Sequence, residues 1–180
     1  MTRNLAILAF NMSADRKTEL FRMIVLILLY ALIGNARSIQ PNPFIPGAVI
    51  AVYMVVPVVG GLLFGPLVGL VAGVFGALLN AISPAGSPFE FASVLPHGIM
   101  GLTAGFLRGK IPTPFAAAIA LAIGHGLNVA SYVVTDLLKT KPLDDLAFWY
   151  GLGYETLVGT VTVFVMVTFY RLGFLSTPHK

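Results

Sequence analysis

The chain has 180 residues, of which 57% are hydrophobic and only 10% are charged, and its mean hydropathy is +0.90. This composition excludes an ordinary soluble domain and indicates a single-domain integral membrane protein. The formal net charge of +4 does not indicate a nucleic-acid partner, because the basic residues lie at segment ends and form no common face.

Hydropathy along the chain predicts an all-α integral membrane protein, a six-transmembrane-helix bundle. The predicted spans cover residues at about 20–36, 47–64, 66–82, 92–107, 112–136 and 147–170. Residues 1–19 are expected to form a cytoplasmic lead, 20–172 the membrane domain and 173–180 a cytoplasmic tail. A tight turn at 64–66 should let Pro66 start the third helix, whereas Pro57 and Pro96 predict kinks or short helices.

The distribution of basic residues predicts the orientation of these spans. With both termini in the cytoplasm, eight of the eleven lysines and arginines lie inside and three outside. The inside set is Arg3, Arg16, Lys17, Arg22, Arg108, Lys110, Arg171 and Lys180, and the outside set is Arg37, Lys139 and Lys141. Because cytoplasmic loops carry the excess of basic residues, this count favours an N-in/C-in topology.

The fifth predicted span carries a polar stripe. Residues 111–135 hold no charged side chain, which is long enough for a helix to cross a hydrocarbon core of about 30 Å. His125, Asn128, Tyr132 and Asp136 fall within an arc of about 80° on such a helix. Polar groups that face lipid are costly, so this face should look into the protein or a wet cavity and is a functional hypothesis. The alternative is a structural hydrogen-bond network between helices.

Other polar residues are expected at the same, outer level of the bundle. They follow the first helix, end the third and begin the fourth and sixth: Asn35, Arg37, Gln40, Asn42, Asn80, His97, Trp149, Tyr150, Tyr154 and Glu155. We therefore predict that hydrophilic side chains from separate spans meet in one chamber near the outer surface.

Several of these residues have a plain structural alternative. Trp149 fits an aromatic belt at the membrane interface as well as it fits ligand stacking. His97 follows a proline at a helix start, and Arg37 at the boundary can simply snorkel. Glu155 shares a helical face with small residues and should point inward, where its partner is Arg37, His97 or a ligand that is cationic or donates hydrogen bonds.

Glycines mark a second feature, because Gly69, Gly73, Gly76 and Ala77 make a small face on the third helix that allows close packing. The pattern Gly65-Pro66-x-x-Gly69-x-x-x-Gly73, followed by Pro-His-Gly-Ile-Met-Gly-Leu at 96–102, resembles the substrate-binding S components of energy-coupling factor transporters. The nearest match to that family's Ala-x-x-x-Ala docking surface, at 31–36, departs from the pattern.

The resemblance implies a multi-pass protein of a prokaryotic plasma membrane that takes up a water-soluble vitamin or precursor. It implies capture of this small molecule near the outer face, with the first loop as a lid and no cofactor. Uptake would be driven by a transmembrane coupling subunit and two cytoplasmic ATPases. A rod-shape scaffold of similar size and topology is a competing resemblance and would carry no ligand.

The sequence also bears on other energy sources and on enzymatic chemistry. Arg108-Gly109-Lys110-Ile111 lacks the residues of a phosphate-binding loop, so the chain itself holds no ATPase motif. Proton-coupled transport through His125, Asp136 and Glu155 is an alternative. A metal-dependent hydrolase built on His97, His125 and Glu155 has no local signature, and we expect no enzymatic activity.

The resulting hypothesis gives each polar residue a role in ligand binding. Asn35, Arg37 and Gln40 would cap the site. His125, Asn128, Tyr132 and Asp136 would bond the ligand from one side, with Tyr154 and Glu155 opposite, Trp149 available for stacking and His97 nearby. Two carboxylates favour a cationic or nitrogen-rich ring, such as a thiamine-like molecule.

Overall fold

The computed structural model describes residues 14–36, 41–45, 50–84, 86–138 and 141–173. Within them the chain forms six α-helices and no strand-built sheet. The helices are α2 (Ala14–Asn35), α3 (Val55–Phe64), α4 (Pro66–Ala81), α5 (Pro88–Leu107), α6 (Thr113–Val134) and α7 (Leu146–Arg171), with short 3₁₀ turns η1 (Val52–Met54) and η2 (Lys141–Asp144). The prediction of an all-α membrane protein is confirmed, since three of these helices are long and apolar enough to cross a membrane.

Each predicted span overlaps one α-helix, although the boundaries differ, and the helices α2, α6 and α7 are the candidate membrane spans among the described residues. The first helix begins at Ala14, so residues 14–19 of the predicted lead are helical. The second span is divided into η1 and a ten-residue α3. Pro57 does not kink α3, because it lies in the first turn, where no backbone N–H is needed. The fourth helix starts earlier than predicted, at Pro88, after Ser87 caps it, and it continues through Pro96.

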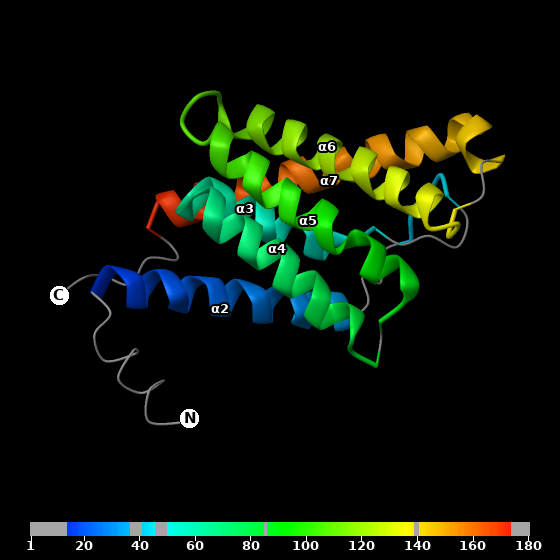
Figure 1. The fold of residues 1–180 in the computed structure, drawn as a ribbon. Helices are drawn as coiled ribbons and strands as arrows, with labels where there is room; N and C mark the ends of the chain where they lie inside the picture. Colours follow the sequence, from blue (N-terminus) through cyan, green and yellow to red (C-terminus); the bar gives the residue numbers. More distant parts are fainter. Residues whose placement is uncertain (1–13, 37–40, 46–49, 85, 139–140, 174–180) are drawn as a thin grey trace, which may run out of the picture.

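Successive helices run in alternating directions, so the beginning of α2 and the end of α7 lie at the same end of the bundle (Figure 1). We call this the basic end, because it holds Arg22, Arg108 and Arg171. There Arg171 donates to the Thr113 hydroxyl at 3.2 Å, and Arg22 stacks over the Phe64 ring at 4.7 Å. The opposite end, where α2, α4 and α6 finish and α5 and α7 begin, is called the polar end.

Glycines bring α4 against α5 with their backbones in contact. A Cβ atom at Gly69 or Gly101 would overlap the backbone of the other residue, and one at Gly73 would overlap the carbonyl of His97. The turn between α3 and α4 is equally tight, because Gly65 has φ 107° and Pro66 is the first residue of α4. The predicted small face and the predicted 64–66 turn are therefore confirmed, and this contact holds α5 in place.

Apolar side chains fill the bundle on both sides of α3. One cluster joins α3, α5, α6 and α7 and includes Val58, Leu62, Met100, Leu121 and Val163. The other joins α2, α3 and α4 around Tyr30, Val56 and Val68. Large apolar side chains on the outside of the helices, such as Phe21, Leu32 and Leu95, remain exposed as expected for a surface that faces lipid.

Candidate functional site

The half of α5 nearest the polar end carries a polar face. Glu90, Ser93 and His97 are spaced by three and four residues, which places them on one side of the helix. Ser93 and His97 are each only 2% exposed. Buried polar groups in an apolar bundle need hydrogen-bond partners, and each of the three finds one on a different element.

His97 links α2 to α6 through its two ring nitrogens. Its Nδ1 makes a short hydrogen bond with the Tyr30 hydroxyl, and its Nε2 lies 3.2 Å from the Asn128 amide nitrogen. An amide NH₂ only donates, so with the amide oriented in this way Nε2 is the acceptor of that contact, while the direction of the Tyr30 bond depends on the histidine tautomer. All three residues are at least 93% buried, so a chain of hydrogen bonds crosses the interior of the bundle from α2 to α6.

A second pair joins α5 to α6 one turn closer to the polar end. The Ser93 and Tyr132 hydroxyls are hydrogen-bonded, and the Tyr132 ring packs edge-on against Phe89 at 5.1 Å. Going from His97 to Ser93 moves four residues along α5, as going from Asn128 to Tyr132 does along α6. The two antiparallel helices therefore stay in register, and two of the four stripe residues face α5.

Glu90 completes the group by accepting a hydrogen bond from the Tyr53 hydroxyl at 2.9 Å. The Tyr53 ring in turn packs edge-on against Tyr30, with centroids 5.1 Å apart. We call the connected set the polar cluster: Tyr30, Tyr53, Glu90, Ser93, His97, Asn128 and Tyr132. It draws side chains from α2, η1, α5 and α6 into one place.

Two acceptors of the polar cluster are buried without a hydrogen-bond partner among the described residues. They are Oε2 of Glu90 and Oδ1 of Asn128. Leaving such an atom unpaired in the interior costs about 1–3 kcal/mol, and more when the group is charged. The cluster can therefore accept at least two further hydrogen bonds from a donor.

His125, the third residue of the stripe, contacts α7 and η1 through its ring nitrogens. Its Nδ1 is 2.8 Å from the Thr156 hydroxyl on α7, and its Nε2 is 3.1 Å from the Met54 sulfur. Glu155, next to Thr156, accepts a hydrogen bond from the backbone N–H of Ala51 at 2.7 Å. Glu155 is thus paired with backbone instead of with His97, whose ring nitrogens are both engaged elsewhere.

Asp136 does not continue the stripe. The α6 helix ends at Val134, and Asp136 adopts φ 56° in the following turn with an exposed side chain. The assumption of an unbroken helix to residue 136 was wrong, because Thr135 already departs from helical geometry and caps the end. The carboxylate that joins the buried group comes instead from Glu90.

The remaining predicted site residues that the structure describes lie outside the polar cluster. Asn35 is exposed and bonds the Ala31 carbonyl and Asn80. Trp149 is 49% exposed and donates to the Leu143 carbonyl, and Tyr154 packs edge-on against Phe44 at 5.8 Å. Arg37 and Gln40 lie outside the described residues.

Four members of the polar cluster were not predicted from the sequence: Tyr30, Tyr53, Glu90 and Ser93. Glu90 offered a signal, because it is the lone charged residue between Arg37 and Arg108. Tyr30 and Tyr53 carry hydroxyls inside otherwise apolar segments, where a hydroxyl needs a partner. Ser93 gave no separate signal beyond its spacing to Glu90 and His97.

The described residues contain no group of three histidines or carboxylates arranged to hold a metal ion. His97, His125 and Glu155, which the hydrolase alternative would bring together, each bond different partners. The geometry instead suits recognition of an uncharged or cationic donor by hydrogen bonds.

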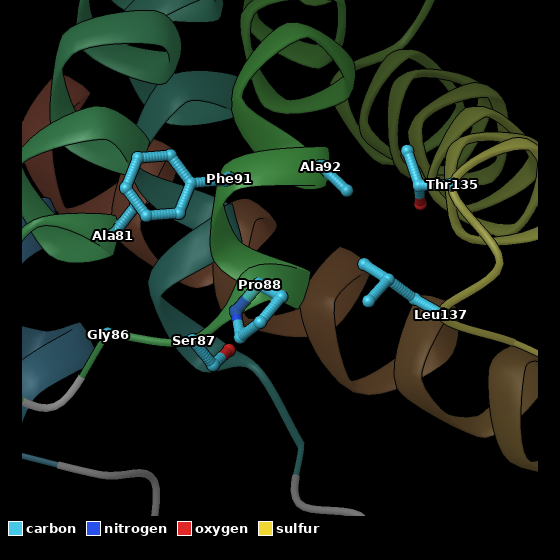
Figure 2. A pocket seen from close by; sticks show the side chains of 8 residues that line it. All are labelled: Ala81, Gly86, Ser87, Pro88, Phe91, Ala92, Thr135 and Leu137. Carbon is cyan, nitrogen blue, oxygen red and sulfur yellow. The ribbon is translucent and has the colours of Figure 1, made fainter.

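An open hollow of about 620 Å³ lies elsewhere at the polar end. Figure 2 shows it between Phe91 and Ala92 of α5 and Thr135 and Leu137 beyond α6. At 100° per residue, Phe91 and Ala92 lie on the side of α5 opposite Ser93 and His97. None of the residues that line the hollow belongs to the polar cluster.

Comparison with known proteins identifies a family. The sequence model of a five-transmembrane, LytS-related family, described as 5TMR of 5TMR-LYT, matches residues 5–144. No curated protein matches, and no solved structure matches. Among the described residues the matched range holds five α-helices, α2 to α6, and α7 lies beyond it.

This match overturns the resemblance to S components of energy-coupling factor transporters. That resemblance depended on Gly65, Gly69, Gly73 and the glycines of α5. In the structure these residues make the tight turn and the backbone contact between α4 and α5. Such glycines report close helix packing, which unrelated membrane bundles share, and so they did not identify the family.

Proposed function

The chain belongs to the family described as 5TMR of 5TMR-LYT, and we propose that this multi-pass membrane protein is a receptor for a small water-soluble molecule. The molecule binds at the polar cluster and donates hydrogen bonds to it. The observation that carries this proposal is the pair of buried, unpartnered acceptors, Glu90 Oε2 and Asn128 Oδ1. A purely structural network would be expected to satisfy its own members.

The chemistry of the cluster favours a nitrogen-bearing cation. The Glu90 carboxylate lies in an apolar bundle and accepts a hydrogen bond from Tyr53, so a positive ligand would lower the cost of its charge. The rings of Tyr30, Tyr53 and Tyr132 belong to the same cluster and suit a cation, because aromatic faces attract positive charge. We therefore expect protonated amines or cationic heterocycles, such as a thiamine-like molecule, to bind better than anions.

We propose that the polar end faces outward and that the basic end is cytoplasmic, in a prokaryotic plasma membrane. Support comes from the basic residues, since Arg22, Arg108 and Arg171 all lie at one end. Six crossings would bring the start of α2 and the end of α7 to the same side, as the alternating helices require. Cysteine labelling at each end in intact cells tests this orientation, and the cysteine-free chain supplies a clean background.

Delivery of the ligand to an energised partner stays a prediction. The coupling subunit and two ATPases were inferred from the overturned resemblance, and proton-coupled transport or a scaffold role needs no such partner. Co-purification from the native membrane distinguishes these cases. Recovery of two ATPases would support transport driven by ATP hydrolysis in partner proteins. Their absence together with ligand binding would favour a receptor that does not take up its ligand.

Ligand binding is tested by thermal stability of the purified protein in lipid nanodiscs against a panel of water-soluble vitamins and amines. A ligand at a hundred times its dissociation constant adds about 2.7 kcal/mol to stability. We expect stabilisation by cationic members, with thiamine as one probe. Glu90→Gln and Asn128→Leu should each abolish it, because each changes one of the free acceptors.

Asp136→Asn is the matched control for Glu90→Gln, since it makes the same change at an exposed carboxylate at the same end. Asparagine also tolerates the positive φ at this position. Failure of every panel member, or equal stabilisation of Glu90→Gln and the unmodified protein, would refute the proposed site.

A further inference from the structure

The short segment before α3, residues 51–54, is hydrogen-bonded to three helices, α5, α6 and α7. The Ala51 N–H bonds Glu155 on α7, the Tyr53 hydroxyl bonds Glu90 on α5, and the Met54 sulfur contacts His125 on α6. Ala51 directly precedes η1, and Tyr53 and Met54 lie within it. A displacement of the segment would therefore change all three at once.

The backbone of this segment is not helical at Ala51, so the Ala51 N–H needs a hydrogen-bond acceptor outside the segment. Val52 N–H bonds the Ile50 carbonyl at 2.9 Å, and Ala51 between them has φ −81° and ψ 70°. These are the values of an inverse γ-turn, in which the central N–H has no partner within the turn. In an apolar bundle such an N–H must find an acceptor elsewhere.

Glu155 supplies that acceptor from a buried position. Its side chain is 9% exposed, and its Oε1 lies 2.7 Å from the Ala51 nitrogen. The space around the carboxylate is lined by Ile50, Val52, Val55 and Val158, with a free volume of only about 10 Å³. That volume is about one water molecule, so there is little room for an organic ligand to bind Glu155 directly.

We propose that Glu155 is a positioning residue: it fixes the turn at Ala51 and thereby holds Tyr53 in the polar cluster and Met54 against His125. This inference assigns Glu155 a role through the backbone, in place of the direct ligand contact expected from sequence, and it rests on the proposed function only for the identification of the polar cluster as a binding site. Since α7 lies beyond the range matched by the family, the appended helix provides this positioning contact.

The experiment measures how often the segment opens, without requiring a ligand. Cysteine is introduced at Val52, which is half-buried in η1, and its rate of labelling by N-ethylmaleimide is measured in nanodiscs. A Thr160→Cys variant reports on α7 itself and serves as the control position. Neither measurement needs removal of native thiols, because the sequence contains no cysteine.

Three substitutions separate the hydrogen bond from charge and from bulk. Glu155→Met keeps the size but removes the acceptor, and Glu155→Asp keeps the charge but withdraws the carboxylate by one methylene. Both should raise labelling at position 52 about tenfold, which corresponds to about 1.4 kcal/mol, with little change at position 160. Glu155→Gln keeps an acceptor of the same reach and should restore the original rate.

Labelling at position 52 that is unchanged in Glu155→Met and Glu155→Asp would overturn the proposal. So would a Glu155→Gln variant as open as Glu155→Met, or a rise of equal size at both cysteine positions. If the vitamin and amine panel returns no ligand but position 52 behaves as expected, the positioning role stands and the receptor proposal fails. The two failures are therefore distinguishable.

Discussion

Helix α5 meets its two main neighbours in opposite ways. Toward α4 it presents glycines, and Gly101 and Gly105 leave no room for a methyl group against the facing backbone. Toward α6 its outer half presents Ser93 and His97, whose side chains bond Tyr132 and Asn128. One contact is made by backbone atoms and the other by side-chain polar atoms.

The two contacts have different roles: the α4–α5 contact makes the bundle rigid, and the α5–α6 contact is suited to ligand recognition. Backbone contact between α4 and α5 gains dispersion energy over many atoms and has one close-packed solution. Hydrogen-bonded pairs between α5 and α6 are few, and the nearby acceptors of Glu90 and Asn128 are incompletely satisfied. We infer that the first contact holds the frame, while the second can exchange partners with a ligand.

The largest effect is expected from Gly101→Ala, which tests the rigid contact. The added methyl group would overlap the carbonyl of Gly69, and backbone atoms have no rotamer with which to move away. We expect a loss of about 3 kcal/mol or failure to fold, measured by thermal or denaturant unfolding in nanodiscs. Stability equal to the parent would show that α4 and α5 are not in backbone contact.

A smaller effect is expected from His97→Leu, which tests the hydrogen-bonded contact. The change removes the ring between Tyr30 and Asn128 and leaves polar groups of both without a partner. We expect a loss of about 2 kcal/mol in the same unfolding assay. If the two side chains interact, adding Asn128→Leu to His97→Leu should cause no further loss of stability. Losses that simply add in the double variant would contradict the pairing of His97 with Asn128.

Tyr132→Phe should have a milder effect, because only the hydrogen bond to Ser93 is lost while the ring keeps its edge contact with Phe89. About 1 kcal/mol is expected. Ser93→Ala should cost a similar amount, and the two changes together should cost little more than either alone. A double-variant loss equal to the sum would mean that the hydroxyls do not interact.

The smallest effect is expected from Gly126→Ala on α6, where a Cβ atom would meet nothing within 4 Å. Alanine restricts the unfolded chain and favours helix, so stability should stay level or rise by up to about 1 kcal/mol. This variant is the matched control for Gly101→Ala. A marked loss would indicate that the exposed side of α6 is covered by a partner.

The approximate positions of the helices could be predicted from the sequence, because crossing a membrane requires local runs of apolar residues. The sequence also identified the glycine face of α4 and the turn at Pro66, since close approach and a turn both need particular residue types. Within the polar stripe it placed His125, Asn128 and Tyr132 on one buried or half-buried face. The end of α6 was misjudged, and Asp136 with it, because helix ends depend on capping details.

Local composition by itself therefore determined that this chain is an all-helical membrane protein and where its helices run. Only the tertiary structure decided which polar groups meet: Tyr30 with His97 across 67 positions, and Ala51 with Glu155 across 104. Hydropathy and helical spacing are properties of neighbouring residues. Pairing between helices depends on their register and rotation in the bundle, which the glycine contacts and the break at η1 set together.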